Sequence, residues 1–404
     1  MNPLRSVSEA KGALRSVRVV DLTRVWAGPL GTRILADFGA DVIKISDPRI
    51  PIATMGRVNN KLNRNKKNIG LRLDTETGRN TLFELISISD IVIENFRPRV
   101  MRNLKLTYDV ISQINPAIIM CSMPGYGLNG PYSEYPAFGS TAEAISGINS
   151  MIGYQVNKPL QTGLSYADPI SGLNSVSLVM AMLRKRILTG QGSHVELALA
   201  DSPIGTLGEF FVAASAGSGN ASILSNKHEY ISPHGVYKTQ GEDNWITIAI
   251  ETDEEWEKLV SMIGDERLKS RSLKHTVDRK NNEAIFDSCI SEWARRMNRD
   301  DAMKLLQANQ IAAGAVLNNL EVLGNEHLNE RHFFSLLTEK EYGEQKYDGQ
   351  SIPGHKKPKP DWFPMNELGE STDDILNSLL GKKHDETSIY YQENQTLVED
   401  EKPN

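Results

Sequence analysis

One carboxylate occupies a position where it could do chemistry. Asp168 lies in the segment GLSYADPISG, directly before Pro169 and the longest helix-forming run of the chain. Asp followed by Pro at a helix start is favoured for capping alone, so a purely structural role would explain the residue. The same position suits a nucleophile, because the positive end of a helix keeps a carboxylate ionised and oriented. The small residues Ala167, Ser171 and Gly172 would let a substrate approach.

A glycine loop provides a second candidate. Gly125 and Gly127 belong to GYGLNG, which follows the apolar run AIIMCS and formally matches the dinucleotide-binding pattern. That pattern also needs a helix opening on its last glycine and an acid about twenty residues on, and the sequence PYSEYPAFG follows here instead. We therefore expect no nicotinamide binding. The loop is either an ordinary tight turn or a turn whose bare amides face a ligand.

Residues 57–72 carry six basic side chains and no acid in a protein of formal charge −6. A solvated face is the usual fate of such a cluster. The alternative is a docking surface for a multiply phosphorylated small molecule, since phosphates form charge-assisted hydrogen bonds with Lys and Arg. The basic residues are Arg57, Lys61, Arg64, Lys66, Lys67 and Arg72.

No metal-binding pattern is present. His327, Glu330 and His332 miss both established two-histidine zinc motifs, and His228 and His234 have no third ligand in sequence.

The two cysteines, Cys121 and Cys289, are too few for a disulfide framework, which predicts a reducing, cytoplasmic compartment. No stretch approaches the ~18 continuous apolar residues of a membrane span, and no signal segment is apparent.

The elements that must position these residues alternate between strand and helix patterns from residue 17 to 122. Short β-branched runs such as VRVVDL, DVIKIS and DIVIE are separated by helical patterns. This alternation predicts an α/β fold with a parallel sheet covered by helices. The 404 residues exceed the usual size of one hydrophobic core, about 250 to 300 residues, so we expect more than one domain. The lack of an excess of basic residues disfavours nucleic-acid binding.

A domain boundary is predicted at the small polar run in residues 213–225, which we interpret as a linker. Residues 226–325 then show the strand and helix patterns of a smaller α+β domain. Residues 383–404 are polar and lack any pattern of a buried face. We therefore expect a loose tail there.

Several motifs in order resemble one family across nearly the whole chain. They are VVDLTRVWAGPLGTRILADFGADVIKI, NRNKKNIGLRLDTETG, DIVIENFRPRVM, GYGLNGPY, PAFGSTAEAISG, GLSYADPISG, TGQGSHVELALAD and LGESTDDIL. The family is that of the class III CoA-transferases, which includes formyl-CoA transferase and carnitine CoA-transferase. The resemblance implies a large Rossmann-like domain from residues 1–212 and 326–404, together with the small domain. It also implies that two chains interlock as a homodimer.

By this resemblance Asp168 is the covalent nucleophile that moves CoA from an acyl-CoA thioester to a carboxylic acid. The implied intermediates are a mixed anhydride and an aspartyl-CoA thioester, with CoA as substrate and product and with no permanently bound cofactor. Gly125 and Gly127 are candidates for the active-site loop that binds the oxyanion, and Phe138 and Gly139 for the acceptor pocket. The implied CoA contacts are Arg24, Trp26, Ala27, Leu71, Arg72, Asn95, Phe96, Arg97 and Arg102.

Some positions depart from the family pattern. Arg24 stands where relatives often carry histidine or a similar polar group, and Asp74 where they often carry lysine. Asn103 replaces an arginine, with Arg102 beside it. These departures predict rearranged phosphate contacts.

Two other functions stay open. The α-methylacyl-CoA racemases share the fold and the aspartate, but they add a histidine that serves as a second acid/base group, and YSEYPAFGSTAEA contains none. A non-catalytic CoA-binding protein would use Asp168 only as a helix cap.

Overall fold

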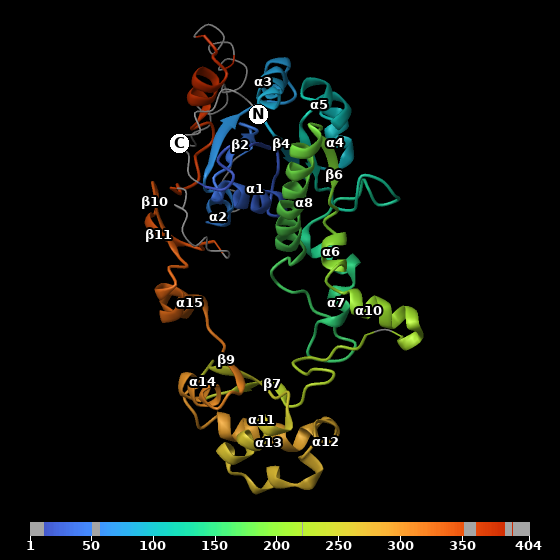
Figure 1. Ribbon diagram of the computed structural model, residues 1–404, viewed down its shortest axis with the longest axis vertical. Helices are drawn as coiled ribbons and strands as arrows, with labels where there is room; N and C mark the ends of the chain where they lie inside the picture. The colour runs from blue at the N-terminus through green and yellow to red at the C-terminus, as the bar shows by residue number, and fades with distance from the viewer. Residues whose placement is uncertain (1–11, 51–56, 220, 351–360, 384–389, 391–404) are drawn as a thin grey trace, which may run out of the picture. The chain divides into compact units, whose positions relative to one another are not determined.

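The computed structural model describes residues 12–50, 57–219, 221–350 and 361–383, together with Tyr390 (Figure 1). The chain divides into two compact units. One unit comprises Met1–Ile148, Gln161–Ser218 and His332–Asn404, and the other comprises Asn149–Leu160 and Gly219–Arg331. Residues 149–160, which the sequence analysis places in the large domain, thus group with the second unit.

The first unit is built on a six-stranded parallel sheet in the order β3-β2-β1-β4-β5-β6 (Figure 1). This order is that of a doubly wound, Rossmann-like sheet, in which the chain reverses its direction of winding between β1 and β4. The predicted α/β fold with an open parallel sheet is therefore confirmed. The strands are β1 Arg18–Asp21, β2 Asp41–Ser46, β3 Lys66–Gly70, β4 Ile91–Glu94, β5 Ile119–Ser122 and β6 Ser193–Glu196.

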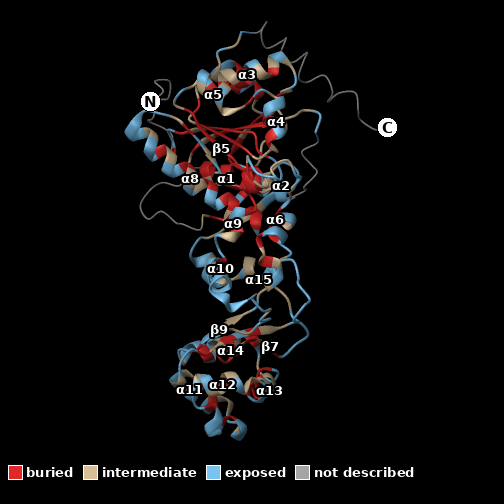
Figure 2. Cartoon of the chain, turned by 90° about the vertical axis from the view of Figure 1, so that its right-hand side faces the viewer, coloured by how far each residue is buried: buried red, intermediate tan, exposed pale blue. Residues whose placement is uncertain are grey.

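Helices cover both faces of this sheet, so its central strands are buried on both sides, whereas the edge strand β6 has exposed residues (Figure 2). Neighbouring residues of a strand point to opposite faces: Val19 packs with α1 (Ala27–Asp37) and α8 (Ala167–Thr189), and Val20 with α3 (Glu76–Ser87) and α5 (Tyr108–Ile114). The unit also contains α2 Arg57–Asn63, α4 Pro98–Asn103, α6 Gly139–Ser146, α9 Asp201–Ile204, α10 Gly208–Ala213, the hairpin β10 Ser335–Glu339 and β11 Gly343–Tyr347, and the helical turns Ala214–Ser218 and Asp374–Leu379. The short helix α7 (Ile148–Met151) follows α6.

The second unit is a smaller α+β structure, as predicted. Its antiparallel sheet has the order β7-β8-β9, and Trp256 and Phe286 form an edge-to-face pair in its core. The elements are β7 His234–Lys238, β8 Trp245–Ala249, β9 Ala312–Ala315, α11 Asp253–Ile263, α12 Thr276–Asn281, α13 Glu283–Ala294, α14 Arg299–Ala308, α15 Asn319–Gly324, α16 Glu326–Glu330 and the 3₁₀ turns Glu266–Lys269 and Arg271–Leu273.

The basic run 57–72 does not form one exposed surface. It folds into α2 and the edge strand β3, where Lys66 is buried and Arg64 is fully enclosed. The Arg64 guanidinium pairs with Asp37 at 2.8 Å and with Asp348 at 3.2 Å, and lies 4.2 Å from the centre of the Trp362 ring. Two of the six basic residues therefore lie inside the protein: Arg64 ties the C-terminal segment to the sheet, and Lys66 pairs with Asp21 at the end of β1.

The predicted loose tail falls mostly outside the described residues, which omit 384–389 and 391–404. Tyr390 lies within that range and is buried, with its hydroxyl donating to the Gly70 carbonyl. The expectation is therefore wrong for Tyr390.

We predict that Arg64→Met lowers the free energy of unfolding by about 3 kcal/mol, because it breaks a fully buried ion pair and leaves the buried Asp37 with Arg33 as its remaining cation among the described residues. Lys67→Met is the matched control. Lys67 is three residues away and pairs with Asp374 at 3.0 Å on the exposed side of β3, so its loss should cost less than about 1 kcal/mol. Urea unfolding of both variants measures the difference, and equal costs would contradict the role given to Arg64.

Candidate active site

Asp168 lies in the first turn of α8, and its side chain does not cap its own helix. Its Oδ1 instead accepts a hydrogen bond of 3.3 Å from the backbone N–H of Ala27, the first residue of α1. Its own N–H donates to the Ser165 carbonyl at 2.9 Å. Asp168 is therefore a contact between the starts of two helices that pack side by side on one face of the sheet (Figure 1).

The carboxyl group is nearly enclosed, with Asp168 only 6% exposed. The pKa of Asp168 is raised from its ordinary 3.8 to about 6. Burial is the largest cause, the Ala27 N–H acts in the opposite direction, and the negative charge of Glu143 contributes to the rise. At neutral pH the group is still an anion. It is a more basic anion than a solvated aspartate, which favours it as a nucleophile.

Gly139 closes the other side of the carboxyl group. A Cβ atom at Gly139 would lie 1.9 Å from Asp168 Oδ2 and 2.7 Å from Ser165 Cβ, so only glycine fits at the start of α6. Phe138 precedes it and is 62% exposed. Of the two residues predicted for the acceptor pocket, Gly139 thus adjoins Asp168, and Phe138, the residue before it, is open to solvent.

The glycine loop packs mainly against other parts of the first unit. A Cβ at Gly125 would lie 2.3 Å from that of Ala137, and Gly127 has a φ of +93°, where a Cβ would lie 2.9 Å from Glu196 Oε1. Glu196 accepts the Leu128 N–H at 2.7 Å. These contacts account for both glycines as packing and turn residues. A role in oxyanion binding remains a prediction.

The predicted CoA contacts follow three strands at one edge of the sheet. Residues 24–27 follow β1, residues 71–72 follow β3 and residues 95–97 follow β4. In doubly wound sheets, ligands bind beyond the carboxyl ends of the strands where the winding reverses, which here is between β1 and β4. The residues predicted to contact CoA in these three segments therefore lie beyond the carboxyl ends of the strands, where such sheets bind ligands.

Two of these segments are bonded directly to each other. The Arg24 N–H donates to Asn95 Oδ1 at 2.7 Å, and the Asn95 amide returns a bond of 2.8 Å to the Arg24 carbonyl. The Arg24 guanidinium lies 5.4 Å from the centre of the Phe96 ring. Val25 has a φ of 67°, an unfavourable conformation for a β-branched residue. Such strain persists only where surrounding contacts hold the backbone.

A buried charge cluster supports this turn, and sequence analysis missed it. Asp21 at the end of β1 is bonded to Lys44 at 3.3 Å and to Lys66 at 3.0 Å, and Lys44 also donates to the Thr23 carbonyl. Burial raises the pKa of Asp21, but the two lysines and the hydroxyls of Thr23 and Thr32 together lower it, and the net shift is downward. Burial lowers the pKa of Lys66 to about 7. Asp21 in the apolar run VRVVDL and Lys44 in the apolar run DVIKIS could have indicated a buried ion pair, because both runs predict buried strands.

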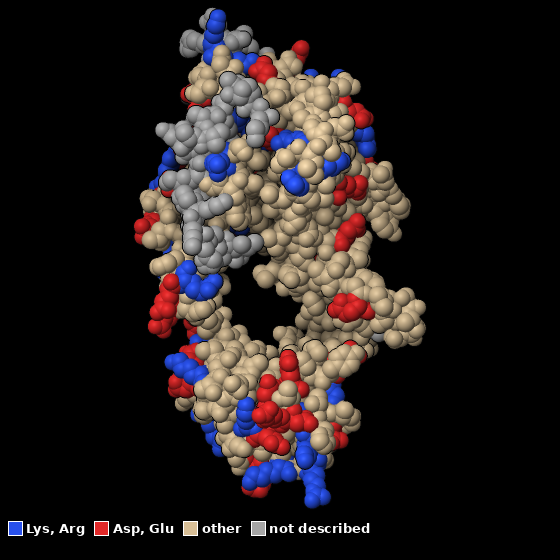
Figure 3. Space-filling view, in the orientation of Figure 1, with Lys and Arg blue, Asp and Glu red and all other residues tan. Residues whose placement is uncertain are grey.

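Two of the remaining residues predicted to contact CoA, Arg72 and Arg102, form ion pairs with acidic side chains. Leu71 is buried, Arg72 pairs with Asp74 at 3.1 Å, and Arg102 pairs with Glu134. Arg97 is half-buried before α4, and Trp26 is half-buried before α1. Among the described residues on the face in Figure 3, Lys and Arg are dispersed among Asp and Glu and do not merge into one basic patch.

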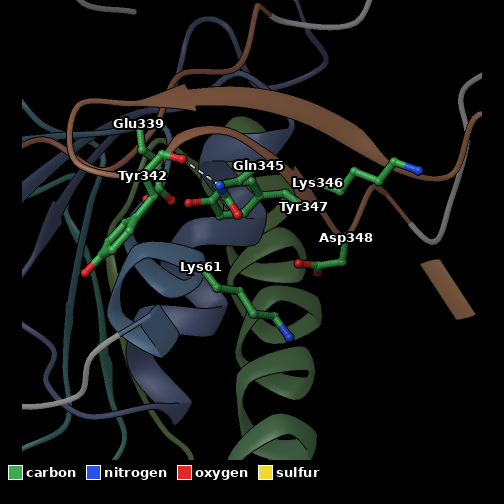
Figure 4. A pocket seen from close by; sticks show the side chains of 7 residues that line it. All are labelled: Lys61, Glu339, Tyr342, Gln345, Lys346, Tyr347 and Asp348. Atoms are coloured by element: carbon green, nitrogen blue, oxygen red, sulfur yellow. Dashed lines mark hydrogen bonds between the residues drawn. The ribbon is translucent and has the colours of Figure 1, made fainter. Parts of the chain in front are cut away.

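A separate pocket of the first unit contains none of the predicted site residues (Figure 4). It lies between α2 and the β10–β11 hairpin and is lined by Lys61, Glu339, Tyr342, Gln345, Lys346, Tyr347 and Asp348.

In the described part of the chain, no three His, Cys, Asp or Glu side chains are grouped as metal ligands would be. None of the helices described combines the length and apolar character needed to cross a membrane.

Comparison with known proteins decides the family. The family model described as CoA-transferase family III matches residues 14–372. The chain belongs to this family. It is accordingly an enzyme, a class III CoA-transferase, as the ordered motifs predicted.

Relatives and a solved structure agree with this family III assignment. The chain is 28% identical over 395 residues to the succinyl-CoA–L-malate CoA-transferase beta subunit of Chloroflexus aurantiacus, covering 91% of this chain and 94% of the relative. It is 30% identical over 409 residues to a formyl-CoA:oxalate CoA-transferase of Streptomyces avermitilis, covering 93% and 95%. A CAIB/BAIF family protein from Brucella suis matches with a TM-score of 0.82 at 26% identity, covering 92% of this chain and 100% of that one.

We predict that Gly139→Ala lowers CoA-transferase turnover by about a hundredfold, because the added methyl group and Asp168 Oδ2 cannot occupy the same space and α6 or α8 must shift. Gly208→Ala is the control, since a Cβ there meets nothing within 4 Å. Steady-state kinetics of the two variants provide the comparison. Full activity of Gly139→Ala would show that the close approach of α6 is unimportant.

Proposed function

We propose that the protein is an acyl-CoA:carboxylate CoA-transferase in which Asp168 is the covalent nucleophile. The observation that carries the proposal is one carboxylate, nearly out of water, with a raised pKa and a backbone N–H on one oxygen. The names of the relatives, which pair succinyl-CoA with malate and formyl-CoA with oxalate, support the substrate classes.

The reaction begins when an Asp168 oxygen attacks the thioester carbonyl of the donor. A C–O bond forms and the C–S bond breaks, giving a mixed anhydride and CoA thiolate. The thiolate then attacks the Cγ carbon of Asp168, the C–O bond to Cγ breaks, and the donor acid leaves as a carboxylate. The enzyme now holds CoA as an aspartyl thioester.

The acceptor carboxylate repeats these steps in reverse. It attacks Cγ of the aspartyl thioester and releases thiolate, which attacks the acceptor's acyl carbon and frees Asp168. No net proton is transferred, because carboxylates and thiolates exchange as anions. The scheme needs neither metal nor redox cofactor, since the nucleophile is already ionised at neutral pH.

The surroundings of Asp168 suit both intermediates. Burial limits hydrolysis of the anhydride and thioester by water. The Ala27 N–H would donate to the aspartyl carbonyl oxygen and to the oxyanion that forms when Cγ is attacked. In this role Ala27 joins Gly125 and Gly127 as a candidate donor.

We propose that CoA lies along the carboxyl edge of the sheet, against residues 24–27, 71–72 and 95–97 and near Arg102. Two features support this location: the reversal of winding between β1 and β4, and the bonded pair Arg24 and Asn95. Arg72 and Arg102 would exchange their present partners, Asp74 and Glu134, for phosphate groups.

Trapping tests the nucleophile. With succinyl-CoA as donor and hydroxylamine present, mass spectrometry should find a hydroxamate at Asp168, because hydroxylamine attacks the activated Cγ. Asp168→Asn should carry no label and should lose about three orders of magnitude of turnover or more, whereas Asp201→Asn, an exposed acid on α9, should keep both. Unlabelled Asp168 or an active Asp168→Asn variant would contradict the mechanism.

We also propose the interlocked homodimer that the family resemblance implies. An apolar stripe on α8 supports an interface there: Leu173, Met180 and Ile187 recur every seven residues and are 54%, 41% and 72% exposed. Exposed apolar stripes of this kind mark association surfaces.

Sedimentation measures the assembly directly. We expect twice the mass of one chain, unchanged over a hundredfold dilution, because interlocked chains separate only when part of the fold opens. A mass that falls to that of one chain on dilution would exclude interlocking.

A further inference from the structure

Glu143 is a buried acid for which the proposed reaction has no use. It lies in α6, four residues after Gly139, so both residues share the helix face that meets Asp168. Glu143 is 1% exposed. None of the ion pairs identified among the described residues includes it, and acids buried to this degree are rarely left without a cation.

Its two oxygens have different environments. Oε1 accepts a hydrogen bond of 2.7 Å from the Thr162 hydroxyl and another from the Tyr166 N–H. Oε2 is buried and has no hydrogen-bond donor in the described part of the chain. Native proteins retain such an oxygen rarely, and each instance calls for an explanation, of which a role at a catalytic site is one.

The loop held by Oε1 leads directly into the reacting group. Between Thr162 and Tyr166, Gly163 has a φ of +77° and Ser165 a φ of 47°, so the backbone makes two left-handed steps. The Ser165 carbonyl then accepts the Asp168 N–H. The bond from Tyr166 to Glu143 therefore fixes the residue two positions before Asp168.

We propose that Glu143 is a positioning residue for Asp168: one oxygen clamps the 162–166 loop, and the unpartnered oxygen keeps a second negative charge beside the nucleophile. A clamp alone does not require an acid, because glutamine could accept both bonds through its own oxygen. The second charge is what distinguishes Glu from Gln. It opposes the ionisation of Asp168 and leaves that carboxylate more basic, hence more nucleophilic, at neutral pH.

Other charged groups on the packed elements do not substitute for Glu143. On α1, Arg33 and Asp37 pair with each other at 3.0 Å. Asp201 lies on α9, and β6 carries His194, which is bonded to Ser122, and Glu196, which is bonded to Leu128. Burial, the Ala27 N–H and Glu143 are the influences on the pKa of Asp168.

The pH dependence of kcat/KM tests the inference, which rests on the proposed role of Asp168. The wild-type rate should fall below an apparent pKa of about 6, because protonated Asp168 is not a nucleophile. Glu143→Gln keeps the clamp and removes the charge, so this acid limb should move down by about half a pH unit or more. The rate at pH 8 should fall severalfold.

Two variants separate the charge from the clamp. Glu143→Asp keeps the charge on a shorter side chain, so its acid limb should stay near that of wild type while kcat falls because the loop is held less firmly. Thr162→Val removes one of the two bonds to Oε1 and should leave the acid limb in place. An acid limb in Glu143→Gln that matches wild type would overturn the inference, as would a shift of equal size in Glu143→Asp.

Hydroxylamine labelling keeps the two proposals distinguishable. If wild type carries the label at Asp168 and Glu143→Gln leaves the pH profile unchanged, only the role of Glu143 is wrong. If wild type carries no label at Asp168, the nucleophile assignment itself fails.

Discussion

The close approach of α1 to α8 is the constraint on which the candidate site depends. A Cβ at Gly31 would lie 2.3 Å from Ser175 Oγ, and one at Gly172 would lie 2.9 Å from the Ala27 carbonyl. Small residues on both helices therefore let the two backbones meet. This brings the Ala27 N–H to Asp168 and shields the carboxyl group from water, so packing between the helices and chemistry at their ends share one cause.

The first turn of α1 must be held as firmly as the helices themselves. It follows Val25, whose left-handed conformation is unfavourable. Two hydrogen bonds hold the preceding turn: Lys44 donates to the Thr23 carbonyl, and the Asn95 amide donates to the Arg24 carbonyl. Asp21 neutralises that lysine inside the protein. The buried ion pairs of Asp21 with Lys44 and Lys66, at the carboxyl ends of the strands, thus fix the turn that leads to the Ala27 N–H.

The alternation of β-branched runs and helical periodicity predicted the parallel sheet and the long helices α1, α3 and α8 of the first unit, whereas β3, which lies within the basic run, was not predicted as a strand. The sequence also singled out Asp168, and the family resemblance added Gly139, which adjoins it. It failed where charge and burial conflict: the basic run 57–72 was taken as surface, yet Arg64 and Lys66 are buried by acids distant in sequence. Glu143 escaped notice for the same reason, since helical periodicity does not reveal which polar residue is enclosed.

Two buried aspartates in this unit are treated in opposite ways. Asp21 has two lysines, so its pKa is lowered; its contribution to stability is present above the pKa of the unfolded chain and is lost as pH falls. Asp168 has an acid neighbour and a raised pKa. Its contribution is present below about pH 4 and is lost as pH rises through 6.

At neutral pH the ionised Asp168 therefore works against folding. A lysine beside Asp168 would remove this cost, but it would also make the carboxylate less basic and a poorer nucleophile. The absence of a cation among the groups that set the pKa of Asp168 is consistent with selection for reactivity over stability at this position. The stability given up there is offset elsewhere in the unit, in the doubly covered sheet and the network around Arg64.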